Sequence, residues 1–259
     1  MLKAKMLKDS VRLLEPQENS NFHYFDRYKT LVTEFCGYLN HVEGIQTKAF
    51  SSLEEERDVQ ERFNNFPLSL QIEKFENFLN YYRHCFELST RGISLRDKGE
   101  SLECFTYLYG LKIPSKDEIF SLLEKSTYVE IYDLNLTQRY RSPDWLETTS
   151  YSLATIETVD WRDLFFRSEH ILARQMEVVT AIYSGQVTLP VYRPVEVHTV
   201  KELKSKTPLC AEIESLIYSP IYDRNDNFAG GLHVLKVNNL RSISFSLHHG
   251  STSREDLPL

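Results

Sequence analysis

The sequence predicts an α+β protein in which an all-helical N-terminal region precedes a β-rich region with flanking helices. Three observations lead to this expectation. Apolar residues recur every three or four positions through residues 22–125, which is the period of an amphipathic helix. After Lys125, runs of β-branched and aromatic residues alternate with Asn, Asp, Gly and Pro, which punctuate strands. Within that second region, residues 169–184 return to the helical period.

The helical region divides into five predicted helices, separated by polar segments or by Gly and Pro. The apolar spacing predicts helices over residues 24–41, 51–63, 68–88, 100–109 and 115–125. A serine and several acidic residues open the second helix, as suits a helix N-terminus. Ser115 and Glu118 form a capping-box pattern at the start of the last helix.

The β-rich region begins with a predicted strand over residues 128–135 and a short strand over residues 138–141. Ser142 and Pro143 then open a short helix, since serine is a favoured cap and proline a favoured first residue. Trp145 and Leu146 are its inward-facing residues. Three further strands are expected over residues 187–192, 210–218 and 228–237, with residues 197–208 as an extended loop.

One long amphipathic helix separates the two groups of strands. Leu172, Met176, Val179 and Tyr183 recur at helical spacing and form the predicted inward stripe, flanked by other apolar residues. Gly185 is a natural end for this helix. A stripe of this width predicts that the helix covers one face of the sheet.

The order of these elements resembles the PAS domain family. The resemblance rests on three segments, which are PDWLETTSYSLATI, WRDLFF and SPIYDRNDNFAGGLHVLKV. Asp226 and Asn227 stand where the family usually has Asn-Gly or Asp-Gly. The resemblance implies a five-stranded antiparallel sheet crossed by the long helix, with a ligand cavity between them. The predicted organisation is a flexible N-terminus (1–21), a helical region (22–125), a PAS-like sensory domain (126–240) and a polar C-terminal tail (241–259).

A PAS-like cavity would be lined by residues from the short helices, the long helix and the penultimate strand. The candidates are Trp145, Leu146, Trp161, Phe165, Met176, Val179, Tyr183, Ile213, Ser215 and Ile217. Because many of these side chains are large, they can equally fill the core and leave no pocket. We therefore expect any cavity to be small.

Cofactor and metal sites have little support in the sequence. By resemblance to haem-binding PAS domains, His170 at the start of the long helix is a possible axial ligand, although an exposed histidine is common there. Residues 142–160 contain no cysteine for a flavin photoreceptor. No bound cofactor and no metal site are expected. Sequence signatures of hydrolases, metalloproteases, P-loop proteins and dinucleotide-binding enzymes do not occur, so a non-catalytic protein is expected.

Amino-acid composition and charge predict where the protein is located and which class of partner it binds. The chain has 259 residues, of which 41% are hydrophobic and 26% charged, with a net charge of −7. Residues 1–120 hold 16 Lys and Arg against 19 Asp and Glu, and residues 121–259 hold 14 against 18, so neither half is a basic block. No run of about 18 apolar residues occurs and no signal peptide is recognised. A cytoplasmic protein without a membrane span is expected.

The resemblance to PAS domains implies a bacterial signalling protein that senses a small ligand or docks a protein partner, and it also implies a homodimer. The alternative is a transcription regulator whose helical half binds DNA, because residues 94–125 can be read as helix, turn, helix. That alternative requires a basic face on residues 94–125. A second alternative is a docking protein with a filled core and no bound ligand.

Overall fold

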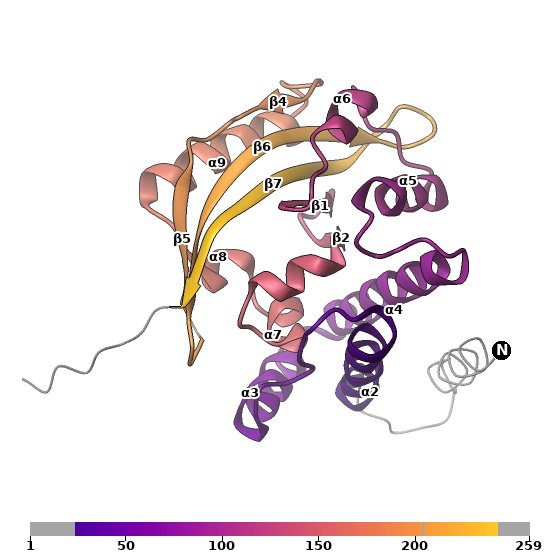
Figure 1. Cartoon of the computed structure of the whole chain (residues 1–259), viewed down its shortest axis with the longest axis vertical. Coiled ribbons are helices and arrows are strands. Elements are labelled where there is room, and N and C mark those ends of the chain that lie inside the picture. The colour runs from indigo at the N-terminus through magenta and orange to yellow at the C-terminus, as the bar shows by residue number, and fades with distance from the viewer. Residues whose placement is uncertain (1–23, 204, 243–259) are drawn as a thin grey trace, which may run out of the picture.

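The computed structural model describes residues 24–203 and 205–242, and the predicted flexible N-terminus and nearly all of the predicted tail lie outside these ranges. It confirms an α+β fold with helices in the N-terminal half and a curled antiparallel sheet in the C-terminal half (Figure 1). The helices of the first half are α2 (Tyr24–Tyr38), which runs on into the π-helical turn η1 (Leu39–Glu43), α3 (Leu53–Asn64), α4 (Leu68–Thr90), α5 (Lys98–Tyr109) and α6 (Lys116–Ser121).

Side-chain caps fix the starts of α3 and α5, from Ser52 and Asp97 respectively. The Ser52 hydroxyl accepts a hydrogen bond from the Glu55 amide at 3.1 Å, which satisfies a donor that the first turn of α3 leaves free. The capping box predicted for Ser115 is wrong. The Ser115 backbone is left-handed, with φ of 52°, and its side chain makes no capping bond. The Glu118 carboxylate instead accepts a hydrogen bond from the Tyr192 hydroxyl.

The sheet has more strands than the five that the sequence predicts. Its strands are β1 (Thr127–Asp133), β2 (Gln138–Arg141), β3 (Phe165–Phe166), β4 (Val191–Tyr192), β5 (His198–Glu202), β6 (Leu209–Tyr222) and β7 (Phe228–Ser242). They lie in the order β2-β1-β7-β6-β5-β3, all antiparallel, and β4 pairs with β6 beside β5. The predicted strand over residues 187–192 is reduced to the two residues of β4.

Strand β5 lies in the segment that the sequence assigns to a loop. His198, Val200 and Glu202 alternate on the buried face of this strand. Glu202 is only 3% exposed, and its carboxylate accepts hydrogen bonds from Thr149, Ser150 and the Leu209 amide. In the sequence, a glutamate close to lysines is typical of a solvated loop. In the structure, hydrogen bonds from distant residues compensate the cost of burying the Glu202 carboxylate.

Three short helices and one long helix connect β2 to the rest of the sheet. They are η2 (Pro143–Thr148), α7 (Leu153–Thr158), α8 (Trp161–Leu164) and α9 (Glu169–Tyr183). Figure 1 shows α9 packed along the β6–β7 ribbon, with α2, α3 and α4 gathered at the other end of the molecule.

The buried face of α9 is offset by one residue from the predicted stripe. Ile171, Gln175, Val178 and Ile182 are the buried residues of this helix, whereas Leu172, Met176, Val179 and Tyr183 are only half-buried. The two sets have the same spacing, so periodicity alone cannot separate them. The set that is buried contains Gln175, and a glutamine is unusual on a buried face. The sequence therefore favours the all-apolar set, which is the one that is only half-buried.

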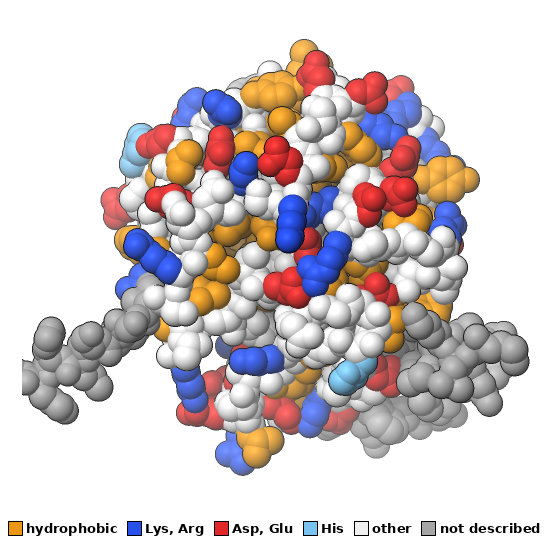
Figure 2. All heavy atoms as spheres, viewed as in Figure 1, with side chains coloured by type: hydrophobic (Ala, Val, Ile, Leu, Met, Phe, Trp, Pro, Cys, Tyr) orange, Lys and Arg blue, Asp and Glu red, His pale blue; other side chains and the backbone are white. Residues whose placement is uncertain are grey.

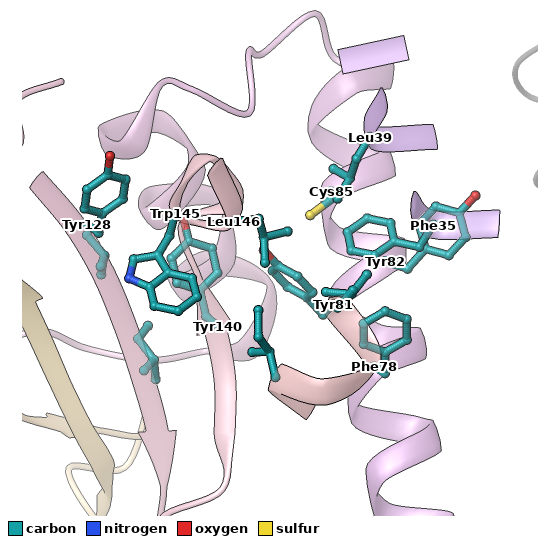
Figure 3. Packing of buried hydrophobic residues seen from close by; sticks show 14 of the residues in the cluster. Phe35, Leu39, Phe78, Tyr81, Tyr82, Cys85, Tyr128, Tyr140, Trp145 and Leu146 are labelled. Carbon is teal, nitrogen blue, oxygen red and sulfur yellow. The ribbon is translucent and has the colours of Figure 1, made fainter. Parts of the chain in front are cut away.

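The helical half and the sheet share one hydrophobic core. Figure 3 shows aromatic rings from α2 and α4, among them Phe35 and Tyr81, leading to Tyr140 on β2 and to Trp145 on η2. The Tyr81 hydroxyl also donates a hydrogen bond to the Arg141 carbonyl at 2.7 Å. The change of secondary structure near residue 125 therefore does not separate two cores.

Candidate functional site

A row of polar side chains crosses the sheet on the face that α9 covers. Arg141 of β2 lies opposite Glu130 of β1, Glu130 lies opposite His233 of β7, and His233 lies opposite Tyr218 of β6. Directly opposed residues project from the same face of an antiparallel sheet. We call these four residues the polar row. It lies in the interior, since Arg141, Glu130 and His233 are each at most 8% exposed.

Glu130 is the central acceptor of the row. Its carboxylate lies 3.5 Å from the Arg141 Nε and 3.5 Å from the His233 Nδ1. Tyr132 and Gln138 donate hydrogen bonds to its two oxygens, at 3.1 and 3.2 Å. Burial on its own would raise the pKa of Glu130, but these neighbours outweigh burial and hold the pKa at about 2. The carboxylate therefore stays charged inside the protein.

The His233 imidazole is held between a carboxylate and a hydroxyl. Its Nε2 lies 3.3 Å from the Ser215 hydroxyl, and Glu130 faces its Nδ1. Serine, histidine and glutamate in this order match the roles of a nucleophile, a base and an orienting acid. Ser215, however, has no exposed surface, and the Tyr218 ring covers the imidazole at 4.2 Å. The arrangement can hold and share a proton, but it gives a substrate no access to the hydroxyl.

Helix α9 and strand β5 contribute further polar groups to this interior. Burial raises the pKa of the Tyr218 phenol, and hydrogen bonds to Ser215 and Gln175 offset part of the rise. The Gln175 Oε1 and the His198 Nε2 are buried and have no hydrogen-bond partner among the described residues. Burial lowers the pKa of His198, which favours the neutral ring.

Arg141, at the end of the polar row, and Arg167, which is near Glu130, each lie over a tryptophan. The Arg141 guanidinium lies 4.2 Å from the centre of the Trp145 ring, and that of Arg167 lies 5.0 Å from the centre of Trp161. The charges of both arginines interact with Glu130. Burial lowers the pKa of Arg167, which shows how far its charge is removed from water.

The ten predicted cavity residues fall into two groups by burial. Trp145, Leu146, Ile213, Ser215 and Ile217 are buried, and Trp161, Phe165, Met176, Val179 and Tyr183 are half-buried. Three of the ten, Trp145, Phe165 and Ile213, line a small cavity of about 30 Å³. This volume suits about one water molecule.

A β-bulge separates two of the predicted lining residues. Ser215 hydrogen-bonds to His233 on the face covered by α9. The pairing shifts between Ser215 and Ile217, so Ile217 lies opposite Val234. Val234 alternates with His233 and points to the other face. Ile217 therefore packs on the face away from α9, and its predicted place beside Ser215 is wrong.

Tyr183 and His170 lie at opposite ends of α9 and away from the cavity. The Tyr183 hydroxyl donates a hydrogen bond to the Asp133 carbonyl at 2.9 Å, which attaches the end of α9 to β1. The side chain of His170 is 76% exposed, and its Nε2 lies 3.2 Å from the Glu196 carboxylate. His170 faces solvent, so its predicted role as a haem ligand between α9 and the sheet has no support in its placement.

The basic residues of 94–125 do not form the free basic face that the DNA-binding alternative requires. Four of them are paired with carboxylates. The pairs are Arg96–Glu147 at 2.7 Å, Lys98–Asp144 at 3.0 Å, Lys112–Asp226 at 2.6 Å and Lys116–Glu103 at 2.6 Å. Figure 2 shows acidic and basic side chains interspersed on the visible face. A groove of about 720 Å³ beside α5 is lined by residues of both signs.

Sequence reasoning missed all four residues of the polar row and found only Ser215, which contacts His233. Glu130 and His233 each stand inside an apolar strand, in YVEIYD and GGLHVLK. A charged residue at an inward-facing strand position is a signal that could have identified them. Arg141 and Arg167 carry no such local signal, because Arg141 ends β2 and Arg167 lies between β3 and α9, where an arginine is ordinary.

Comparisons with known proteins add no relative, since no family model, no curated protein and no solved structure matches this chain. Within residues 24–203 and 205–242, no helix has the length and apolar character of a membrane span. The same residues contain no cluster of three or more His, Cys, Asp or Glu side chains arranged for a metal ion.

Proposed function

We propose that this chain is a PAS-like, non-catalytic regulatory protein of the bacterial cytoplasm that senses a small ligand between α9 and the sheet. The buried polar row is the observation that carries the proposal. Burying charged groups is costly unless they are paired, and a core of apolar residues would be at least as stable. A row of polar residues that includes the buried Arg141, Glu130 and His233 is understandable if these groups respond to a ligand or a proton.

The order of the elements supports a PAS-like module. Two strands, a set of short helices and one long helix precede the last strands, as the resemblance implies. The long helix lies against the sheet strands that follow it. Strands β3 and β5 are additions to the five expected strands, of which the third is reduced to the two residues of β4.

A route for the output leads from the polar row to the helical half. The Arg141 side chain belongs to the row, and its carbonyl accepts the hydrogen bond from Tyr81 of α4. A ligand that shifts Arg141 therefore shifts the position at which α4 is attached to β2. The expected response is a change in packing between the sheet and the N-terminal helices, and a homodimer formed through these helices would transmit it.

Mass spectrometry of the purified full chain tests the proposal. Denaturation should release a small molecule in stoichiometric amount, and its removal should change hydrogen exchange in α4. Tyr81→Phe should weaken that change, whereas the exposed Tyr107→Phe should not. An absorption spectrum reports a coloured cofactor in the same sample.

A second candidate function is docking of a protein partner with a filled core. The observation that favours it is the cavity volume of about 30 Å³, which leaves little room for an organic ligand. A protein that releases no molecule, and whose α4 exchange is unchanged by any added small molecule, would support docking over sensing.

A further inference from the structure

We infer that the ligand of this site is a small planar oxyanion, of the size and shape of a monocarboxylate such as formate or acetate, held by the guanidinium groups of Arg141 and Arg167. This inference rests on the proposed function, because it names the class of molecule that the same interior receives. Its support comes from hydrogen-bond geometry, charge and space.

The first support is a set of buried donors without acceptors. The Nη1 of Arg141 and the Nε of Arg167 are buried and make no hydrogen bond with any described residue. The Arg141 Nε makes no hydrogen bond either and has the Glu130 carboxylate at the longer ion-pair distance of 3.5 Å. Arg141 is only 8% exposed, so solvent does not readily satisfy these groups. A buried N–H group without an acceptor destabilises a protein by about 1–3 kcal/mol, and more when it is charged. An acceptor supplied by a ligand removes this penalty.

The second support is the charge of the interior. Two guanidinium groups interact electrostatically with Glu130, and among the residues that the structure describes Glu130 is the only carboxylate within salt-bridge distance of Arg141. Glu157 is the other acid that interacts with Arg141, and burial raises its pKa. Around Glu130, two guanidinium groups stand against a single carboxylate, which leaves positive charge in excess there. An excess of buried positive charge selects an anion over a neutral or cationic ligand.

The third support is the shape of the donors and the space beside them. A guanidinium presents its N–H groups in one plane, which matches the two oxygens of a carboxylate. Trp145 and Phe165, the rings on which Arg141 and Arg167 lie, also line the cavity of about 30 Å³. Because the cavity suits about one water molecule, a monocarboxylate enters only if neighbouring side chains move, and an extended organic acid requires a larger rearrangement of the core.

The two tryptophans of the chain provide a direct reporter of this binding. The chain contains only Trp145 and Trp161, and each lies under one of the two arginines. Moving a guanidinium off an indole ring alters the fluorescence of that ring. Titrating the full chain with sodium acetate at constant ionic strength should therefore give a saturable change in tryptophan fluorescence. Acetamide, which has the same shape and no charge, should give none.

Substitutions at the arginines test which groups hold the anion. Arg141→Gln and Arg167→Gln should each weaken acetate binding about 10- to 100-fold, the effect of losing one charge-assisted hydrogen bond. Arg139→Gln is the matched control, because Arg139 lies on the same strand and forms a surface ion pair with Asp133. If Arg141→Gln fails to fold, Arg141→Lys keeps the charge without the planar fork and should also weaken binding.

Several outcomes would overturn the inference. Equal responses to acetate and acetamide would remove the role of charge, and acetate binding that survives in both Arg141→Gln and Arg167→Gln would remove the role of the arginines. A neutral molecule released from the purified protein would overturn the oxyanion while leaving ligand sensing intact. A chain that releases no molecule and responds to no added anion would overturn the proposed function as well.

Discussion

The ring of Tyr218 lies parallel to the imidazole of His233, with the ring centres 4.2 Å apart and 3° between the ring planes. The two residues face each other directly across β6 and β7. This stacking covers one face of the imidazole, so its nitrogens are directed within the sheet toward Ser215 and Glu130. The backbone pairing of the sheet thus determines which groups can exchange protons with His233.

Glu130 should make the protein acid-sensitive within a defined pH range. Its pKa of about 2 in the folded protein lies below the ordinary value of 4.5. The charged form therefore stabilises the fold above pH 4.5, and this contribution is lost as the pH falls from 4.5 toward 2. The difference corresponds to about 3 kcal/mol. Urea unfolding of Glu130→Gln should lack this pH dependence, and Glu103→Gln at the surface should keep it.

His84 should make the stability of the fold depend on pH at higher values than Glu130 does. It is only 2% exposed, and burial lowers its pKa from 6.5 to about 4. The unfolded chain binds the proton more tightly, so stability falls as the pH drops from 6.5 to 4 and then levels off. The loss is about 3 kcal/mol. His84→Phe should abolish it, and an unchanged pH profile for this variant would contradict the assignment.

The ion pair of Lys98 and Asp144 should be essential for joining the helical half to the sheet half. The two side chains are 4% and 8% exposed, and they meet at 3.0 Å. Lys98→Met leaves the Asp144 charge buried and unpaired, which should lower the free energy of unfolding by about 3–5 kcal/mol. The double variant Lys98→Met with Asp144→Leu should recover most of this loss. Lys116→Met breaks an exposed pair and should cost at most about 1 kcal/mol.

Gly230 should tolerate no side chain. Its φ is +147°, and a Cβ atom there would lie 2.0 Å from the Tyr132 carbonyl oxygen. Gly230→Ala should therefore destabilise the β1–β7 pair by more than about 3 kcal/mol, since a strained backbone and a clash combine. Gly37→Ala is the control, because nothing lies within 4 Å of a Cβ at this position in α2. It should raise stability by about 0.5–1 kcal/mol. Thermal unfolding should show a lower midpoint for Gly230→Ala and a slightly higher midpoint for Gly37→Ala than for the unsubstituted chain.

Local sequence signals predict the positions of several elements closely. The strand predicted over residues 138–141 is β2 (Gln138–Arg141), and the helix predicted over residues 169–184 is α9 (Glu169–Tyr183). Both are bounded by residues whose effect is local, namely Pro143 at the start of η2 directly after β2, and the left-handed Gly185 after α9. Signals of this kind depend on neighbours in the chain and are visible without the fold. The predicted capping role of Ser142 is wrong, because its hydroxyl instead accepts a hydrogen bond from the Val129 amide of β1.

The candidate site could be predicted only in part. Trp145, Phe165 and Ile213 do line a cavity, because large apolar residues near the long helix are a reasonable expectation for a core. Ile217 does not, because a bulge between strands reverses its face. Register shifts of this kind depend on the partner strand, which no local pattern reveals.

The sequence by itself determined that a helical half is followed by strands around one long helix, because side-chain periodicity and capping are properties of short segments. Only the tertiary structure decided which face of α9 is buried, that residues 198–202 form a strand, and that Arg141, Glu130, His233 and Tyr218 make one row. These features depend on contacts between residues up to about a hundred positions apart. The energies of such contacts are set by pairing and burial in the folded chain, where a residue's neighbours in space outweigh its neighbours in sequence.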